Sequence, residues 1–367
     1  MRLRYLLPAV AIVPLLAALL VVGCNDKGGT GGSSGGPGGA AVRISGGGAT
    51  FVDPIMQKWS AEYKTAKGTE IDYSKSGSSD GIKQMTEKSL DFGCSDAPMK
   101  KDQVDKAKEK GGDVVHVPLI MGAVAVVYNL PSVPSLKLSG PVIADIYLGK
   151  LTKWNADPIK ALNPGVELPD TKITPVYRQE GSGTTNIFTE YLNKVSPEFA
   201  EKIPASTSPT WPQIGLAQKG SDGVAAHVKQ NEGCIGYVEV SYAKMNNIHT
   251  ALVQNSKGKF MTPDAAAVTA AGEWAINQKQ TKAPYSLHEL TYSLTNADTD
   301  AAYPICGISY GLLYKKQSGE KGKNLVEFFK WATSDGQKFA TDLHYAPLPA
   351  ELSKKVADRL NQIEFAD

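Results

Sequence analysis

The sequence has almost no net charge, and this absence limits its partners. The formal charge is +2, and Arg2 and Arg4 supply both charges within a 23-residue start that contains no acid. The rest of the chain is therefore neutral, so any anion binding must come from local geometry and not from a global field. No concentrated basic patch with interleaved aromatic residues is present, which argues against a nucleic-acid partner.

Signatures of metal and nucleotide sites are missing as well. The 4 cysteines and 5 histidines form no C-x-x-C motif and no Cys/His cluster. We therefore expect no zinc or other metal site and no cofactor. The segment Gly181–Thr185 lacks the lysine of the G-x-x-x-x-G-K-[ST] motif, so it is not a nucleotide-binding P-loop.

The first feature that is present is a targeting segment. A short basic start precedes an uncharged apolar run over Tyr5–Val22, which is followed by Gly-Cys at Cys24. This arrangement resembles a bacterial lipoprotein signal, with residues 1–23 as the signal peptide and Cys24 as the lipidated residue. An uncleaved transmembrane helix is the alternative, and the two prolines within the run favour cleavage. Residues 24–41 are mostly glycine and serine, which predicts a flexible tether.

About 325 residues follow the tether, a length that favours two domains over one. Strand-like runs alternate with helix-like runs, which indicates an α/β architecture. Three times a strand leads into a small, hydroxyl-rich loop that opens a helix. The three units are Val42–Ser45 before a helix from Asp53, Glu70–Ser74 before a turn and a helix over Ile82–Lys88, and Ile173–Tyr177 before the loop 178–185 and a third helix.

Three further runs complete the pattern. Val117–Tyr128 is a long apolar run that suits a buried strand crossing between lobes, and Tyr303–Leu313 is a second region of this kind. The stretch Asn324–Ala332 is amphipathic at helical spacing.

The loops of the three repeated units contain the donors of an anion site. A helix start presents unpaired N–H groups and a partial positive charge, and serine and threonine hydroxyls add donors. Each loop alone also fits an ordinary turn or cap. Arg178 stands at the end of the third strand, where it can donate two parallel hydrogen bonds to an oxyanion. Asp96 precedes Pro98, and on spacing alone it is a cap or Asx-turn residue.

Several motifs in a fixed order carry a family resemblance. They are Gly48–Phe51, Gly77–Ser79, Asp91–Pro98, Asp145–Lys150 with Lys153 and Trp154, Arg178 with Gly181–Thr184, and Gly233–Glu239. Together they resemble the periplasmic phosphate-binding PstS family, the substrate-binding proteins of phosphate ABC transporters. The resemblance extends over Ala41–Asp367.

The resemblance implies an α/β fold of the type II periplasmic-binding-protein class, with two α/β lobes and a ligand cleft between them. Lobe I is expected to comprise residues 41–123 and 310–367, and lobe II residues 124–309. The resemblance further implies a non-enzymatic, monomeric protein that captures inorganic phosphate and passes it to the permease subunits of an ABC importer. Its expected location is extracytoplasmic, anchored to the cell membrane by a lipid on Cys24, and periplasmic where the cell has an outer membrane.

The resemblance also assigns the phosphate ligands, residue by residue. They are Thr50, Phe51, Ser78, Asp96, Arg178, Ser182, Gly183 and Thr184. In this assignment Arg178 supplies the main positive charge, Asp96 accepts a hydrogen bond from a protonated phosphate oxygen, and the others donate through hydroxyls or backbone amides. The chain departs from the family at two positions. Glu180 replaces an aspartate that pairs with the arginine, and Asp80 replaces a glycine, where it complements the helix dipole.

Asp96 is expected to determine which anion is bound. A buried carboxylate facing an oxyanion is unfavourable unless a proton lies between them. Phosphate carries such a proton at neutral pH and sulfate does not, so one residue can bind the first anion and reject the second. Arsenate also carries a proton and should be rejected less well.

The cysteines and the competing functions leave alternatives open. By the same analogy, Cys234 and Cys306 lie near the hinge, and we hypothesise that they form a disulfide. The nearest rival function is binding of another oxyanion, such as sulfate or molybdate. A serine hydrolase or phosphatase using Ser79 of the G-x-S-x-G match with His344 is a more distant rival, and an adhesin or sensor without ligand is a third.

Overall fold

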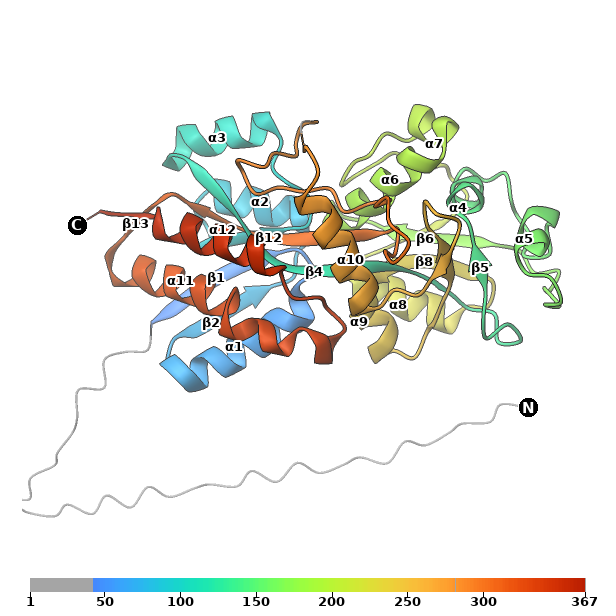
Figure 1. Cartoon of the computed structure of the whole chain (residues 1–367), viewed down its shortest axis with the longest axis horizontal. Coiled ribbons are helices and arrows are strands. Elements are labelled where there is room, and N and C mark those ends of the chain that lie inside the picture. Colours follow the sequence, from blue (N-terminus) through green and yellow to red (C-terminus); the bar gives the residue numbers. More distant parts are fainter. Residues whose placement is uncertain (1–41, 281, 367) are drawn as a thin grey trace, which may run out of the picture. The chain divides into compact units, whose positions relative to one another are not determined.

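A mixed β-sheet forms the centre of the structure (Figure 1), which is a computed structural model that describes residues 42–280 and 282–366. Within these residues nine strands pair into one sheet. They are β1 (Arg43–Gly48), β2 (Glu70–Ser74), β3 (Phe92–Ser95), β4 (Val114–Tyr128), β6 (Thr174–Arg178), β7 (Leu216–Gln218), β8 (Cys234–Glu239), β9 (His249–Thr250) and β12 (Cys306–Tyr314). The strand order is β2-β1-β3-β12-β4-β8-β6-β7, and β9 pairs with β4.

Helices surround this sheet and two small sheets complete the fold (Figure 1). The described helices are α1 (Asp53–Lys67), α2 (Ser78–Thr86), α3 (Lys101–Gly111), α4 (Gly140–Tyr147), α5 (Asp157–Leu162), α6 (Gly183–Val195), α7 (Pro197–Lys202), α8 (Gly220–Gln230), α9 (Val240–Met245), α10 (Ala265–Ile276), α11 (Gly319–Ala332), α12 (Ala350–Asn361) and the 3-10 turns η1 (Asp335–Phe339) and η2 (Thr341–Leu343). The small sheets comprise β5 (Lys137–Leu138) with β10 (Leu252–Gln254) and β11 (Phe260–Met261), and β13 (Lys316–Ser318) with β14 (Glu364–Ala366).

The large sheet consists of two parallel halves joined by two antiparallel strands. β1, β2 and β3 run parallel, and so do β6, β7 and β8. Between them, β12 pairs antiparallel with β3 and β4, and β4 pairs antiparallel with β8. β4 pairs with β12 as far as Ala123 and with β8 from Val124 onward. The apolar run predicted to cross between lobes is therefore a strand that passes from one half of the sheet to the other.

In this topology the carboxyl ends of the parallel strands in the two halves point toward each other. We call the region between these ends the gap. Ser95, at the end of β3, pairs with Tyr310, which pairs with Pro118 of β4. Glu239, at the end of β8, pairs with Val124 of the same strand. The strand from Pro118 to Val124 is about 20 Å long at the usual rise per residue. Loops and helix starts that follow the parallel strands of both halves consequently approach each other across this distance.

The predicted elements are mostly confirmed, with one wrong boundary. α1 begins at Asp53, as expected, and α6 is the predicted third helix, which buries Phe188, Tyr191 and Leu192. α2 begins at Ser78 and not at Ile82. Its start was misplaced because Gly77, with φ of 104°, already turns the chain into the helix, and the segment read as a turn forms the first helical turn.

The amphipathic prediction near the carboxyl terminus is also confirmed. α11 contains the predicted stretch and buries Leu325, Phe328 and Phe329. The ring of Phe329 packs edge-on against Phe92 of β3, with centroids 5.2 Å apart. The helix therefore covers the first parallel half of the sheet.

The proposed disulfide between Cys234 and Cys306 is wrong, because Cys94, Cys234 and Cys306 are all free and buried. Cys306 pairs with Ala123 of β4, whereas the carbonyl of Cys234 accepts the N–H of Asn129 at 3.0 Å. Those two partners, Ala123 and Asn129, lie six positions apart along extended β4 and the residue that follows it, and a disulfide requires Cα atoms within about 7 Å.

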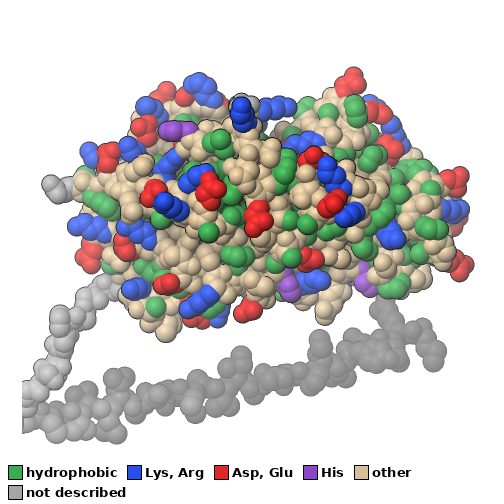
Figure 2. All heavy atoms as spheres, viewed as in Figure 1, with side chains coloured by type: hydrophobic (Ala, Val, Ile, Leu, Met, Phe, Trp, Pro, Cys, Tyr) green, Lys and Arg blue, Asp and Glu red, His purple; other side chains and the backbone are tan. Residues whose placement is uncertain are grey.

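The targeting predictions fall outside the described residues. These are the signal peptide over residues 1–23, the lipidated Cys24 and the tether over residues 24–41. Within the described residues no helix is both long and apolar enough to cross a membrane, and no cluster of three or more His, Cys, Asp or Glu side chains could hold a metal ion. On the face in Figure 2, basic and acidic side chains are interspersed.

Candidate functional site

Four helix starts meet in the gap between the two halves of the sheet. The Thr50 hydroxyl, just before α1, lies 2.9 Å from the Ser221 hydroxyl in the first turn of α8. The backbone N–H of Gly183, the first residue of α6, donates to the Ser78 hydroxyl at the start of α2 at 3.0 Å. Each half of the sheet thus contributes two helix starts, and each start contacts one from the other half. Their partial positive charges point at one place.

Gly183 allows the second of these contacts. A Cβ atom at this position would lie 2.6 Å from the Ser78 hydroxyl oxygen and from the Asp96 Cβ atom. Such distances are far below van der Waals contact, so a side chain here would push α6 away from α2. The same glycine brings the α6 amides next to the Asp96 turn.

Arg178 reaches across the gap from the end of β6. Its side chain is 1% exposed, and Nη1 donates to the Thr50 hydroxyl at 3.0 Å and to the Ser221 hydroxyl at 3.3 Å. The Nη1 edge of the guanidinium thus faces neutral hydroxyls, so it can also donate to an anion.

The Glu180 carboxylate pairs with the opposite edge of the Arg178 guanidinium. Arg178 Nε donates to Glu180 Oε1 at 2.8 Å, and Nη2 donates to the same oxygen. Both carboxylate oxygens also accept the N–H of Gly220, at 3.1 and 3.2 Å. The longer glutamate side chain therefore preserves the pairing expected of an aspartate and additionally fixes the start of α8.

Asp96 lies in a different environment, because no cation among the described residues forms an ion pair with it. It is 4% exposed and accepts hydrogen bonds from Ser309 at 2.8 Å and from Ser78 at 3.5 Å. Burial raises the pKa of the Asp96 carboxyl to about 7, while Ser309 and the positive charge of Arg178 act in the lowering direction. This carboxyl is therefore poised between its charged and neutral forms near neutral pH.

The remaining predicted ligands lie around these two groups. Ser182 caps α6 by accepting the N–H of Thr185 at 3.2 Å. Thr184 is fully buried beside Asp96, and its hydroxyl has no hydrogen-bond partner among the described residues. Phe51 is also fully buried, and its carbonyl accepts the Tyr345 hydroxyl at 2.5 Å. The structure therefore brings six of the predicted residues together at the meeting point of the helix starts, namely Thr50, Ser78, Asp96, Arg178, Gly183 and Thr184. Phe51 and Ser182 are their neighbours in the chain.

Sequence reasoning missed several residues that hold the site. Ser221 and Ser309 contact Arg178 and Asp96, and Tyr242 donates to the Thr50 carbonyl at 2.7 Å. The signal for Ser221 was a glycine and a hydroxyl residue at a helix start, as in the three recognised loops. It was overlooked because β7 is only three residues long and largely exposed. Ser309 and Tyr242 gave no local signal.

Two predicted polar residues serve structural roles. Asp80 lies in the first turn of α2 and accepts a hydrogen bond from Gln84, which fits the helix-dipole interpretation. The Ser79 hydroxyl bonds to the Thr207 hydroxyl at 3.1 Å, and no described histidine is hydrogen-bonded to it. The arrangement is not that of an activated serine nucleophile.

A two-part parallel sheet with helix starts converging on a buried arginine defines a solute-binding protein of the periplasmic class. Residues 35–336 match the model of the PBP superfamily domain. The solved structure of a human phosphate binding apolipoprotein has a TM-score of 0.70 at 21% identity, with 86% of this chain and 93% of that chain covered. That of a phosphate binding protein from Stenotrophomonas maltophilia has a TM-score of 0.68 at 18% identity, with coverage of 87% and 94%. At these sequence identities the two comparisons show a shared fold and nothing more.

Curated relatives identify the family more closely. The phosphate-binding protein PstS of Xylella fastidiosa strain 9a5c is 40% identical over 356 residues, which cover 93% of this chain and 94% of that protein. The PstS protein of Pasteurella multocida is 40% identical over 319 residues, with coverage of 86% and 89%. The chain therefore belongs to the PstS family of phosphate-binding proteins, which are binding proteins and not enzymes.

Proposed function

We propose that the protein binds one inorganic phosphate ion in the gap between the two halves of the sheet and delivers it to an ABC importer. The observation that carries this proposal is that one cluster of helix starts contains both a buried arginine, Arg178, and a buried carboxyl, Asp96, which is not ion-paired among the described residues. Membership of the PstS family supports the same ligand.

The charges of the site residues determine what each of them contributes to phosphate binding. Arg178 and the N–H groups at the starts of α1, α2 and α6 stabilise the negative oxygens of phosphate. The hydroxyls of Thr50, Ser78, Ser182 and Thr184 add short neutral donors. Asp96 accepts a hydrogen bond from the one O–H group that the ion still carries. Since the groups are buried, these interactions replace water and distinguish strongly between a protonated and a fully ionised oxyanion.

Lobe I is proposed to comprise residues 41–123 and 310–367, and lobe II residues 124–309. The pairing pattern supports these boundaries, because β4 changes its partner between Ala123 and Val124. β12 supports them too, since its register with β4 shifts between Ser309 and Tyr310. Bending at these two positions would open the gap and release the ion.

The membrane anchor and the oligomeric state belong to the same proposal. A lipid on Cys24 would hold the protein on the extracytoplasmic side of the membrane, close to the permease subunits of the importer. The Gly/Ser tether would give it the freedom to dock and release. A monomer would suffice, because every proposed ligand comes from one chain.

Titration calorimetry of the purified full-length protein with phosphate, sulfate and arsenate tests the ligand. We expect tight binding of phosphate, weaker binding of arsenate and no detectable binding of sulfate at pH 8. Equal affinities for phosphate and sulfate would contradict proton recognition and favour a general oxyanion-binding protein.

A further inference from the structure

A cavity adjoins the proposed phosphate site, and none of the predicted phosphate ligands lines it. Its volume is about 520 Å³, and its lining includes Ile82, Ala97, Lys100, Asn186, Thr207 and Lys282. Ile82 lies one turn beyond Ser78 on α2, and Ala97 follows Asp96. The N–H of Asn186 donates to the Ser182 carbonyl at 3.1 Å. The cavity and the phosphate site therefore share α2, the Asp96 turn and α6 as a common wall.

The lining of this cavity is strongly positive in a chain that is otherwise balanced. Four lysines line it, with one glutamate and no aspartate, whereas the whole chain has 39 basic and 37 acidic residues. The lysines are Lys100, Lys194, Lys279 and Lys282. Charges of one sign gathered around a concave surface attract and hold ions of the other sign.

The single acid does not compensate for these lysines. Glu190 accepts the Tyr285 hydroxyl at 2.5 Å and a hydrogen bond from Ser293, and its Oε1 lies 3.2 Å from Lys194 Nζ. Its charge is thus taken up by one lysine and two hydroxyls. Among the described residues, the other three lysines of the cavity have no carboxylate within ion-pair distance.

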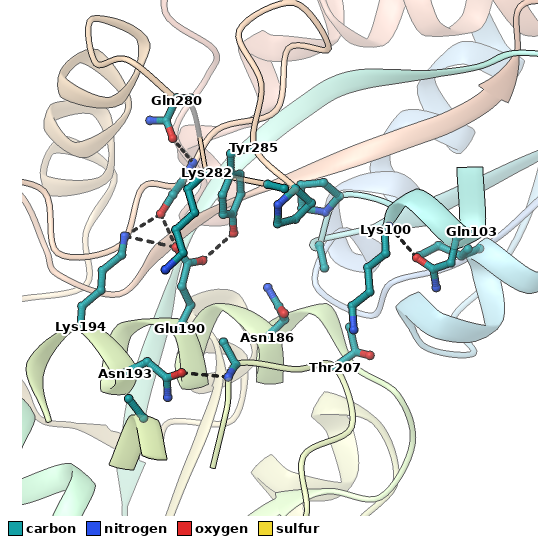
Figure 3. Close-up of a pocket in the computed structure, with 18 of the residues that line it drawn as sticks. Lys100, Gln103, Asn186, Glu190, Asn193, Lys194, Thr207, Gln280, Lys282 and Tyr285 are labelled. Carbon is teal, nitrogen blue, oxygen red and sulfur yellow. Dashed lines mark hydrogen bonds and ion pairs between the residues drawn. The ribbon is translucent and has the colours of Figure 1, made fainter. Parts of the chain in front are cut away.

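Figure 3 shows how the uncompensated charges are placed. Lys100 and Lys282 extend toward α6 on either side of Asn186. Lys100 precedes α3, and Lys282 belongs to the segment before Tyr285. Under the proposed division these two lysines belong to different lobes. Closing the lobes brings like charges together, and a negative ion between them would remove that repulsion.

The other residues that line the cavity indicate which kind of anion it would bind. Asn186, Asn193 and Gln103 offer amide donors, while Ile82 and several alanine and proline side chains offer apolar surface. The volume exceeds what an inorganic ion needs and suits a small organic molecule. We propose that this cavity binds a small organic anion with two or more negative charges, and that its binding favours the closed form and tightens phosphate binding.

This inference rests on the proposed function, because the coupling requires that phosphate also favours the closed form. The coupling must be reciprocal, so each anion raises the affinity for the other by the same factor. The lysines are exposed and partly screened by salt, so we expect a coupling near the low end of the usual range, about fivefold.

Calorimetric titration of the full-length protein with phosphate, in citrate and in acetate at equal ionic strength, tests the inference. Citrate is the polyvalent probe and acetate the monovalent control. We expect the phosphate dissociation constant to be about fivefold lower in citrate. An unchanged or higher constant in citrate would overturn the second site. Absence of phosphate binding in both buffers would instead overturn the proposed function.

Paired variants locate the effect. Lys100→Gln/Lys282→Gln removes the repulsion itself, so in acetate it should bind phosphate at least as tightly as the unaltered protein does, and it should lose the citrate effect. Lys229→Gln/Lys354→Gln removes the same charge from exposed positions that do not line the cavity, and it should retain the citrate effect. If the first variant still responds to citrate, or if the second loses the response, the anion does not bind in this cavity.

Discussion

Arg178 and Asp96 are both buried at the same site, but the protein treats their charges in opposite ways. Arg178 is paired with Glu180 and held by two hydroxyls, so its charge is compensated before any ligand arrives. Asp96 accepts hydrogen bonds from the hydroxyls of Ser309 and Ser78, has no ion-pair partner among the described residues, and burial raises its pKa to about 7. The comparison indicates that the arginine provides general affinity for anions, whereas the aspartate discriminates among them.

Asp96→Asn should break this asymmetry most strongly. The amide carries no charge and can donate a hydrogen bond to an unprotonated oxygen, so sulfate should become a ligand while phosphate affinity falls much less. We expect the ratio of phosphate to sulfate affinity to fall by up to about 10⁴-fold. Calorimetry at pH 8 measures both constants. A variant that keeps the selectivity of the unaltered protein would show that Asp96 does not recognise the proton.

Arg178→Met tests the other member of the pair. It removes the cation and leaves Glu180 facing the ligand, so phosphate affinity should fall by about 10² to 10³-fold, the scale found when one partner of a buried ion pair is removed. The ratio of phosphate to sulfate affinity should change little in this variant, because all oxyanions should bind poorly.

The double variant Arg178→Met/Glu180→Met separates binding from folding. It replaces the pair by apolar side chains, so the thermal stability lost in the single variant should largely return. Phosphate binding should stay weak. Recovery of binding together with stability would mean that Arg178 only supports the fold.

The pH dependence of sulfate binding sharpens the comparison further. Above the raised pKa of about 7, Asp96 is charged and repels sulfate; below it, Asp96 is neutral and can donate a hydrogen bond. Sulfate affinity should therefore increase as the pH falls, by about tenfold per unit above pH 7, and should level off below that. Asp96→Asn should show a flat profile. A flat profile in the unaltered protein would contradict the titration of Asp96.

The site residues that could be predicted from sequence differ from those that were missed in how local their structural signal is. Arg178 could be placed from sequence because it lies where a recognisable strand ends, and parallel strands bring their ends together. Asp96 was assigned through the family resemblance, since its spacing alone predicts a cap or Asx-turn residue. Ser309 lies inside β12, next to the register shift before Tyr310. Its contact with Asp96 depends on strand pairing over a long sequence separation, which no local pattern encodes. The wrong Cys234–Cys306 pairing failed for this reason too, since closeness to a hinge does not fix the position along β4.

Ser221 shows where local reasoning could have gone further. The sequence Lys219-Gly220-Ser221 opens α8 as Gly77-Ser78 opens α2, but the preceding strand is short and exposed. The small and hydroxyl residues of the loop therefore predicted this helix start better than the apolar strand pattern before it. A fourth helix start was therefore recognisable by its small and hydroxyl residues alone.

Ser221→Ala gives the smallest expected effect and tests whether this fourth helix start matters. The Ser221 hydroxyl contacts both Thr50 and Arg178, so its loss should loosen both without removing a charge. We expect phosphate affinity to fall by about three- to tenfold, the value of one neutral hydrogen bond, with selectivity over sulfate unchanged. Ser221→Thr, which keeps the hydroxyl, should recover most of the affinity. If the alanine variant altered selectivity as strongly as Asp96→Asn, the separation between an affinity side and a discriminating side of the site would be untenable.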